Sequence, residues 1–200
     1  MKNIFKLMGI ALVSLSMMTA CGGKDEEKEG KDTTPETTTP TVKVTFDGNT
    51  YSSEFASQVA ATGSSQGINY TIFDFHPVAT NQATQVADLI PGATVMVLSN
   101  EAGSFTSAGV DANGYLDGDV YTYEFYDATC LQDQSGNLYG DWWGKTASVE
   151  ITKLDLTAKL ASFTSSATMF DALDALVNGA GVENAATAEM TCEASNIALN

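Results

Sequence analysis

The densest group of oxygen ligands in the chain lies in the segment DANGYLDGDVYTYE. Asp111, Asn113, Asp117 and Asp119 offer carboxylate and amide oxygens, the ligands that Ca²⁺ takes in sets of six to eight. Counted from Asp111, however, Leu116 stands where an EF-hand loop requires glycine. Asp, Asn and Gly are also the residues that tight turns need. The segment therefore predicts either a calcium site or a turn-rich hairpin loop.

A second group of residues has the side chains that sugar binding uses. Tyr139, Trp142 and Trp143 lie beside Gly140 and Gly144. Aromatic rings can cover the apolar C–H faces of a sugar, and three further tyrosines lie nearby in the sequence: Tyr115, Tyr121 and Tyr123. Adjacent residues of a strand point to opposite faces, so one tryptophan is expected in the core and the other at a ligand or under a loop. We predict ligand binding by Tyr139, Trp142 and Trp143.

The motifs that could indicate catalysis give weaker evidence than these two groups of residues. Residues 63–67, GSSQG, match the G-x-S-x-G string of a nucleophile elbow, but an elbow needs a strand before it and a helix after it. In this chain the string is a polar loop before a strand, and the single histidine, His76, is interpreted as a strand-terminal residue without a special role. The two catalytic carboxylates of a glycosidase have no characteristic spacing in the sequence, so such a pair cannot be recognised from the sequence. We expect no enzymatic activity.

These residues must be positioned by strands, because short runs of alternating apolar residues recur between turn signals. The pattern predicts an all-β domain, either an antiparallel β-sandwich or a lipocalin-like barrel, with one or two short helices. Strands are expected at residues 42–46, 50–53, 68–75, 94–98, 120–126 and 147–154. Short helices are expected at 83–90 and at 169–177, where an irregular extension of a strand is the alternative.

The charge balance excludes several partners. The chain has 25 acidic residues against 9 lysines and no arginine, and loss of Lys2 and Lys6 with a leader takes the net charge from −16 to −18. Binding to a phosphate backbone needs a patch of cationic side chains. Nucleic acid and anionic lipid surfaces are therefore not expected as partners, and the acidity keeps an exposed protein soluble.

The first 20 residues are typical of a leader. Lys2 and Lys6 precede an apolar run from residue 7 to residue 18, which is too short to span a bilayer. The run ends in Met-Thr-Ala followed by Cys21, which resembles the lipobox of bacterial lipoproteins. The resemblance implies that Cys21 is acylated, becomes the new N-terminus, and anchors the protein to a membrane.

The next residues, GGKDEEKE, resemble the export signal of Bacteroides-type surface lipoproteins. That resemblance implies a place on the outer membrane, facing the cell exterior; a solvated charge run in a tether is the alternative. Residues 30–41 are rich in Thr and Pro and predict an extended linker. Within it, Asp32-Thr33-Thr34 resembles an O-glycosylation sequon of the same bacteria, which implies a glycan on Thr33.

The last third of the chain carries a further resemblance. Residues 148–155, 158–169 and 188–193 resemble the closing strands of small uncharacterised Bacteroides-type surface lipoproteins, although the usual glycines are missing. The resemblance implies a β-sandwich or a lipocalin-like barrel. It indicates a fold and no activity.

Two cysteines remain after Cys21. Cys130 and Cys192 are 62 residues apart, and in an exported chain they either form a disulfide or stay as two buried thiols. A disulfide closing so long a loop would stabilise the fold by roughly 3–4 kcal/mol.

Together these patterns divide the chain into a leader (residues 1–20), a lipidated tether (21–41) and one β-rich domain (42–200). We expect an outer-membrane lipoprotein that acts as a non-catalytic binding or accessory module. One alternative is a glycan-binding protein of an outer-membrane uptake system, and another is a lipocalin-like carrier of a small apolar ligand. No cofactor other than calcium is expected, and the sequence leaves the oligomeric state open.

Overall fold

The computed structural model describes residues 39–52, 55–78, 82–83, 88, 90–111, 114–127, 131–132, 138–139 and 141–200. The chain divides into two units, residues 1–38 and 39–200, and all of these residues belong to the second unit. Several predictions therefore lie outside the described residues: the leader, the acylated Cys21, the tether up to residue 38 and the glycosylated Thr33.

The described residues form thirteen β-strands and one short π-helix, labelled η3, at Leu173–Val177. The strands are β1 (Thr41–Phe46), β2 (Asn49–Tyr51), β3 (Ser57–Ser65), β4 (Ile68–His76), β5 (Gly92–Val97), β6 (Gly103–Val110), β7 (Leu116–Gly118), β8 (Val120–Tyr126), β9 (Leu131–Gln132), β10 (Leu138–Tyr139), β11 (Trp142–Asp155), β12 (Leu160–Asp171) and β13 (Thr187–Ala198).

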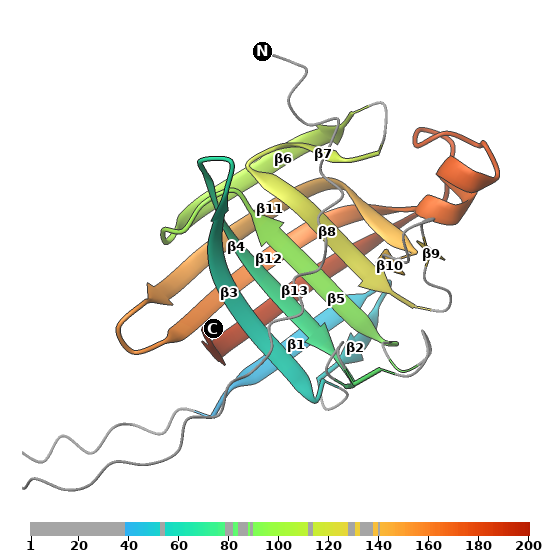
Figure 1. The fold of residues 1–200 in the computed structure, drawn as a ribbon. Helices are drawn as coiled ribbons and strands as arrows, with labels where there is room; N and C mark the ends of the chain where they lie inside the picture. Colours follow the sequence, from blue (N-terminus) through green and yellow to red (C-terminus); the bar gives the residue numbers. More distant parts are fainter. Residues whose placement is uncertain are drawn as a thin grey trace, which may run out of the picture. The chain divides into compact units, whose positions relative to one another are not determined.

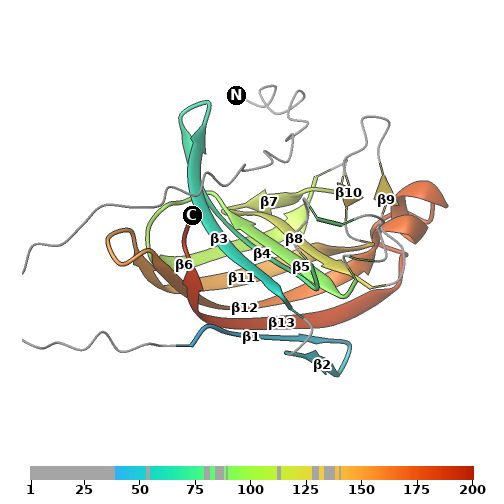
Figure 2. The ribbon, with the colours of Figure 1, turned by 60° about the horizontal axis from the view of Figure 1, so that its bottom comes forward.

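Nine strands form one continuous antiparallel sheet in the order β2-β1-β13-β12-β11-β8-β5-β4-β3. The sheet branches at β11, which pairs with β8 through Trp142 and Trp143 and with β6 through residues 147–151. Figures 1 and 2 show that this sheet curls into a half-barrel. The predicted all-β antiparallel class is confirmed, and the architecture is a single curled sheet instead of two stacked ones.

The edge strand β3 contacts the chain just after β13. Ala60 of β3 forms a parallel bridge with Leu199, just after β13. The Asn200 N–H donates to the Ala60 carbonyl oxygen at 2.9 Å. Residues 139 positions apart in sequence thereby connect the edge strand β3 to the end of β13.

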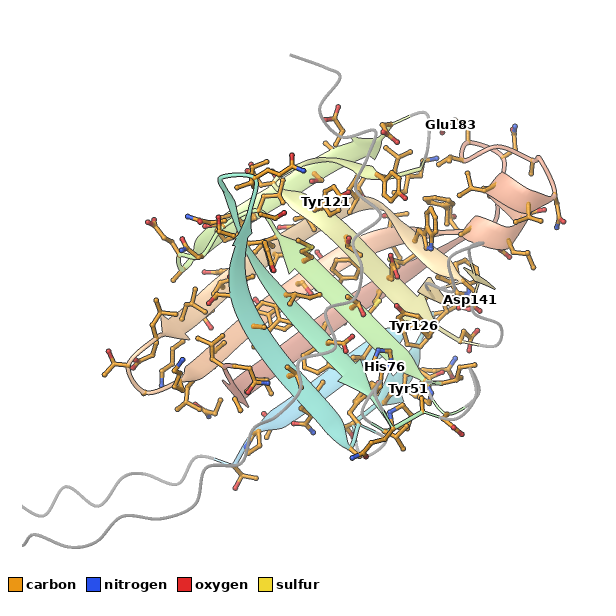
Figure 3. All side chains as sticks on the ribbon, viewed as in Figure 1. Tyr51, His76, Tyr121, Tyr126, Asp141 and Glu183 are labelled. Carbon is orange, nitrogen blue, oxygen red and sulfur yellow. The ribbon has the colours of Figure 1, made fainter. Side chains whose placement is uncertain are left out.

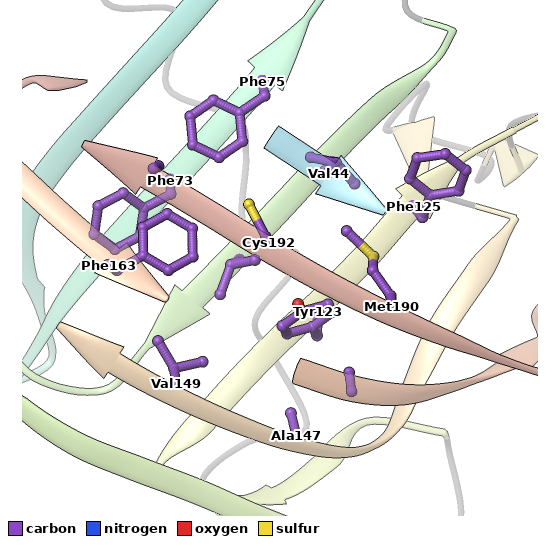
Figure 4. Close-up of a cluster of buried hydrophobic side chains, with 14 of the residues drawn as sticks. Val44, Phe73, Phe75, Tyr123, Phe125, Ala147, Val149, Phe163, Met190 and Cys192 are labelled. Atoms are coloured by element: carbon purple, nitrogen blue, oxygen red, sulfur yellow. The ribbon is translucent and has the colours of Figure 1, made fainter. Parts of the chain in front are cut away.

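The core lies on the inner face of the sheet. Along β13 buried and exposed residues alternate, which puts Met190 and Cys192 inside as the two-residue period of a strand requires. Aromatic rings fill the space between the walls: the Phe73 and Phe163 centroids are 4.0 Å apart, and those of Phe46 and Phe125 are 4.3 Å apart. Figure 4 shows Phe73, Phe125 and Phe163 together with the Cys192 sulfur.

The helix expected at residues 169–177 is shorter in the structure. β12 continues to Asp171, because Met169 and Phe170 are both fully buried on opposite faces of the strand. Only residues 173–177 are helical, so the alternative of a strand extension holds for the first part of the segment. Most of the other expected helix, at residues 83–90, lies outside the described residues.

The GSSQG string lies at the tip of the β3–β4 hairpin. Gln66 and Gly67 have φ angles of 52° and 81°, the left-handed pair that a two-residue hairpin turn needs. Residues 63–65 belong to β3, so the interpretation of the whole string as a polar loop is wrong for its first three residues, and only Gln66 and Gly67 form the turn.

Candidate functional site

A β-bulge in β8 places Tyr121 on the outer face of the sheet. Met96 pairs with Thr122 and Val97 pairs with Val120, so Tyr121 is an extra residue without an opposite partner in β5. An extra residue of this kind bends its strand and redirects a side chain. Val120 and Tyr123 remain in the core, while Tyr121 is partly exposed, as its label on β8 in Figure 3 marks.

The two tryptophans at the start of β11 face opposite sides, as the alternation of a strand requires. Trp142 packs against the core, with its ring edge-on to Phe46 at 5.1 Å between centroids. Trp143 faces outward, where it lies edge-on to Phe170 at 6.2 Å. Of the predicted ligand-binding residues, only Trp143 is thus seen at the outer surface, and the Tyr139 side chain lies outside the described set.

Four rings form a continuous series on the outer face, and we call Tyr121, Tyr115, Trp143 and Phe170 the aromatic row. Tyr121 and Tyr115 are nearly parallel at 6.1 Å and 6°, and Tyr115 and Trp143 follow at 6.0 Å and 20°. Phe170 is fully buried at one end in a small cluster with Ala172, Ala175 and Ala185, whereas Tyr115 is 37% exposed. The row is therefore anchored at the buried Phe170 end and open to solvent at Tyr115.

The loop before β7 fixes Tyr115. The Asp111 N–H donates to the Tyr115 carbonyl oxygen at 2.8 Å, and the Tyr115 N–H donates to Asp111 Oδ1 at 3.1 Å. Between them, Gly114 has a φ angle of 87°, and a side chain there would contact Trp143 at 3.4 Å. The loop thus lies directly on the Trp143 ring, and only glycine adopts this backbone angle without strain.

One carboxylate, that of Glu124, lies beside the aromatic row. Glu124 is the direct register partner of Trp143, so the two side chains are neighbours on the outer face. Glu124, Tyr115, Tyr121 and Trp143 line the same shallow depression, whose enclosed volume is only about 10 Å³. Burial raises the pKa of the Tyr121 hydroxyl, and the nearby Tyr115 and Asp111 raise it further. The surface is therefore shallow and aromatic, with one carboxylate among its lining residues.

The same face of β4, β5 and β8 carries a buried polar network. Asp74 Oδ1 lies 2.9 Å from His76 Nε2 and accepts a hydrogen bond from Thr94 Oγ1 at 2.7 Å. The His76 ring meets Tyr126 edge-on at 5.0 Å, and the Tyr126 hydroxyl donates to Glu124 Oε2 at 3.1 Å. Burial, with the charges of Glu124 and Asp74, raises the pKa of Tyr126 well above its ordinary value.

His76 is therefore more than a strand-terminal residue. It is 2% exposed, and its ring contacts Tyr126, whose hydroxyl donates a hydrogen bond to Glu124. A single histidine at a strand end has no sequence signal for this role, because part of its network comes from other strands. Figure 3 labels His76 and Tyr126 close together on neighbouring parts of the sheet.

Two acidic residues, Asp127 and Asp141, lie where β8 ends and β11 begins. The Asp127 N–H donates to Asp141 Oδ1 at 2.8 Å, and burial together with the Asp141 carboxylate raises the pKa of Asp127. Asp141 is 8% exposed, and its carbonyl oxygen accepts the Ala172 N–H at 2.9 Å. Its carboxylate thus joins two strand ends, which is a structural use of the group.

The predicted calcium ligands are placed as follows. Asp111 closes the Tyr115 loop, Asp117 lies in β7, Asp119 follows it, and Asn113 is outside the described residues. Within the described part of the chain, no group of three or more His, Cys, Asp or Glu side chains is arranged to hold a metal ion. The hairpin-loop alternative accounts for the observed backbone bonds of this segment.

Cys192 is a free thiol, fully buried on the inner face of β13, and burial raises its pKa far above the ordinary value. The disulfide with Cys130 that the sequence allowed is therefore not formed at Cys192 in this structure. The Cys192 side chain belongs to the main hydrophobic core. Cys130 itself lies outside the described residues.

A larger hollow, of about 200 Å³, lies over β11 and β12. It is lined by small and hydroxyl-bearing residues and by Glu189, whose carboxylate accepts a hydrogen bond from Thr168 Oγ1 at 3.0 Å. Its lining has no aromatic side chain to cover the apolar face of a ligand. The depression at the aromatic row has a smaller volume than this hollow, but its lining contains more of the aromatic and polar groups that recognise ligands.

Comparison with protein-family models, curated proteins and solved structures finds no match for this chain. In the part of the chain that the structure describes, no helix has the length and apolar character of a membrane span. The case for function therefore rests on the residues and their geometry.

Proposed function

We propose that this chain is an outer-membrane lipoprotein, anchored through acylated Cys21 and facing the cell exterior, that acts as a non-catalytic binding module. The apolar leader ending in Ala20-Cys21 and the lysine and acids that follow support the anchor and its address. The Thr/Pro-rich residues 30–41 act as the tether between the lipid and the domain.

The ligand we propose is a glycan, and the aromatic row is its binding surface. The observation that carries this proposal is the succession of Tyr121, Tyr115 and Trp143, nearly parallel and about 6 Å apart, in one solvent-facing depression with Glu124. The rings offer apolar faces to sugar C–H groups, and the carboxylate and the tyrosine hydroxyls accept or donate hydrogen bonds to sugar hydroxyls.

The carrier alternative gains no support from the interior of the sheet. A carrier needs a large apolar cavity, whereas Phe73, Phe125 and Phe163 are fully buried and pack into the space between the walls. The aromatic-row depression and the hollow over β11 and β12 are both open to the outer surface.

The experiment is affinity electrophoresis of residues 22–200 against a panel of polysaccharides, with the same assay on Tyr115→Ala and Trp143→Ala. This protein lacks only the leader and the acylated cysteine, so it retains every described contact. Loss of one ring contact that contributes about 1.4 kcal/mol lowers affinity about tenfold. We expect one glycan to retard the protein and each variant to lose most of that retardation.

Leu156→Ala is the matched control, because Leu156 is 54% exposed in the turn between β11 and β12 and outside the aromatic row. It should bind like the parent protein. Absence of retardation by every polysaccharide, or equal retardation of the parent and both ring variants, contradicts the proposal.

A further inference from the structure

The hollow over β11 and β12 lies on the same face of the sheet as the aromatic row. Thr146 of β11 is exposed and the next residue belongs to the core, so Thr146 points outward as Trp143 does. On β12, Thr168 lies two residues before Phe170 of the row, with the core residue Met169 between them. Thr168 and Phe170 therefore share the outer face, roughly 6.7 Å apart along the strand.

Along β11 the two depressions are separated by one residue. Gly144 lines the depression at the aromatic row, and Thr146 lines the hollow. Lys145 between them is the extra residue of a β-bulge opposite β12, and its ammonium group forms an ion pair with Glu183 at 2.7 Å. Neither residue of this ion pair is among the lining residues of the depression or the hollow. The two depressions therefore follow one another along β11, which lies beside β12 in Figures 1 and 2.

The hollow offers hydroxyl groups where the row offers rings. Its lining side chains are mostly small, and a volume of about 200 Å³ stays open above them. The hydroxyls belong to Thr146, Ser148, Ser166 and Thr168, and the last of these donates to the Glu189 carboxylate at 3.0 Å. A hydroxyl group donates one hydrogen bond and accepts two, as the hydroxyls of a sugar also do. The hollow therefore suits the hydroxyl-bearing edges of a sugar, and the row suits its apolar faces.

We infer that the glycan is a chain of several sugars that runs from the aromatic row along β11 into the hollow. This inference rests on the proposed function and names its ligand class as an oligosaccharide or a segment of a polysaccharide, in place of a single sugar or a disaccharide. Ser148 lies five residues after Trp143, and one of the five is the bulge residue Lys145, which leaves roughly 13 Å along the strand. A sugar ring is about as large as one aromatic side-chain ring, so a ligand that contacts both the rings and these hydroxyls has more than two sugars.

The test measures how affinity depends on chain length. The probes are disaccharides to octasaccharides made by partial hydrolysis of each polysaccharide of the panel, xylan, mannan, β-glucan and amylose among them. Titrations into residues 22–200, followed by tryptophan fluorescence, give the affinity for each length. We expect the hexasaccharide of the bound glycan to bind at least about tenfold more tightly than its disaccharide, and longer chains to gain little more.

Two double variants separate the hollow from the rest of the outer face. Thr146→Val with Ser166→Ala removes two hydroxyl groups of the hollow and leaves its shape nearly unchanged. Thr41→Val with Ser195→Ala is the matched control, because these exposed register partners on β1 and β13 line neither depression. We expect the first variant to weaken hexasaccharide binding several-fold without changing disaccharide binding, and the control to bind both like the parent protein.

Equal affinity for the disaccharide and the hexasaccharide, with binding lost in Tyr115→Ala, overturns the inference and leaves the proposed glycan function standing. Length dependence that is the same in the two double variants also overturns the inference, because the longer chain then makes its contacts outside the hollow. Absence of binding to every oligosaccharide and every polysaccharide overturns both the inference and the proposed function.

Discussion

Ser107 shows how much one side chain contributes where the sheet branches. Its hydroxyl donates to the Val120 carbonyl oxygen at 2.8 Å and accepts the Val120 N–H at 3.0 Å. Val120 is completely buried, and Ser107 is 4% exposed. One hydroxyl therefore satisfies both backbone groups of a core residue where β6 meets the start of β8.

Ser107→Ala leaves that N–H and that carbonyl group without their hydrogen bonds. Buried polar groups without partners cost roughly 1–3 kcal/mol, so the free energy of unfolding should fall by about that amount. Urea unfolding followed by fluorescence measures it. Ser104→Ala, at an exposed position of the same strand, is the control and should change stability little. An unchanged urea midpoint in Ser107→Ala would refute the assigned role.

At the scale of elements, β7 and β6 approach each other through a glycine. Gly118 has a φ of 158°, and a side chain there would lie 2.6 Å from the Thr106 carbonyl oxygen and 2.8 Å from the Ser107 Cα. Both are backbone atoms of β6, so they cannot move away as the end of a flexible side chain could. Gly109 has a similar φ of 150°, but its surroundings are open within 4 Å.

The two glycines give a matched pair. Gly109→Ala should cost only the backbone strain, about 1 kcal/mol, whereas Gly118→Ala adds a steric clash with β6 and should cost at least twice as much. Chemical denaturation of both variants measures the difference. Equal destabilisation would mean that the close approach of β7 to β6 is not required for the fold.

At the scale of the whole molecule, the contact that connects the edge strand β3 to the end of β13 is small. Leu199 is 4% exposed and bridges Ala60, and its N–H donates to the Lys159 carbonyl oxygen at 3.0 Å. Its side chain belongs to the main core. Loss of this side chain therefore weakens both the core and the contact between β3 and β13.

Leu199→Ala should lower stability by roughly 2–4 kcal/mol, the range for a buried leucine that leaves a cavity. Leu156→Ala, at the exposed turn, should cost a few tenths of a kcal/mol. Thermal unfolding of the two variants compares them. If both lower the melting temperature equally, then Leu199 does not stabilise the curled sheet.

The arrangement of side chains on the outer face depends largely on contacts between residues that are far apart in the sequence, and no local sequence pattern shows these contacts. The expectation that one tryptophan is in the core and the other outside follows from strand alternation, and Trp142 and Trp143 obey it. Which of the two faces outward depends on the register with Phe125 and Glu124, which lie on another strand. The contact between His76 and Tyr126 is likewise set by the pairing of distant strands.

The amino-acid sequence by itself determined the all-β class and several strands close to their observed bounds, because the alternation of apolar residues acts over a few neighbouring residues. It missed β3 and β6, whose runs of Ser, Thr, Ala and Gly have little apolar contrast. Only the tertiary structure decided the curl of the sheet, the bulge that turns Tyr121 outward and the assembly of the aromatic row. These depend on strand registers between distant segments, since a shift of one residue in any pairing would exchange the two faces of the sheet.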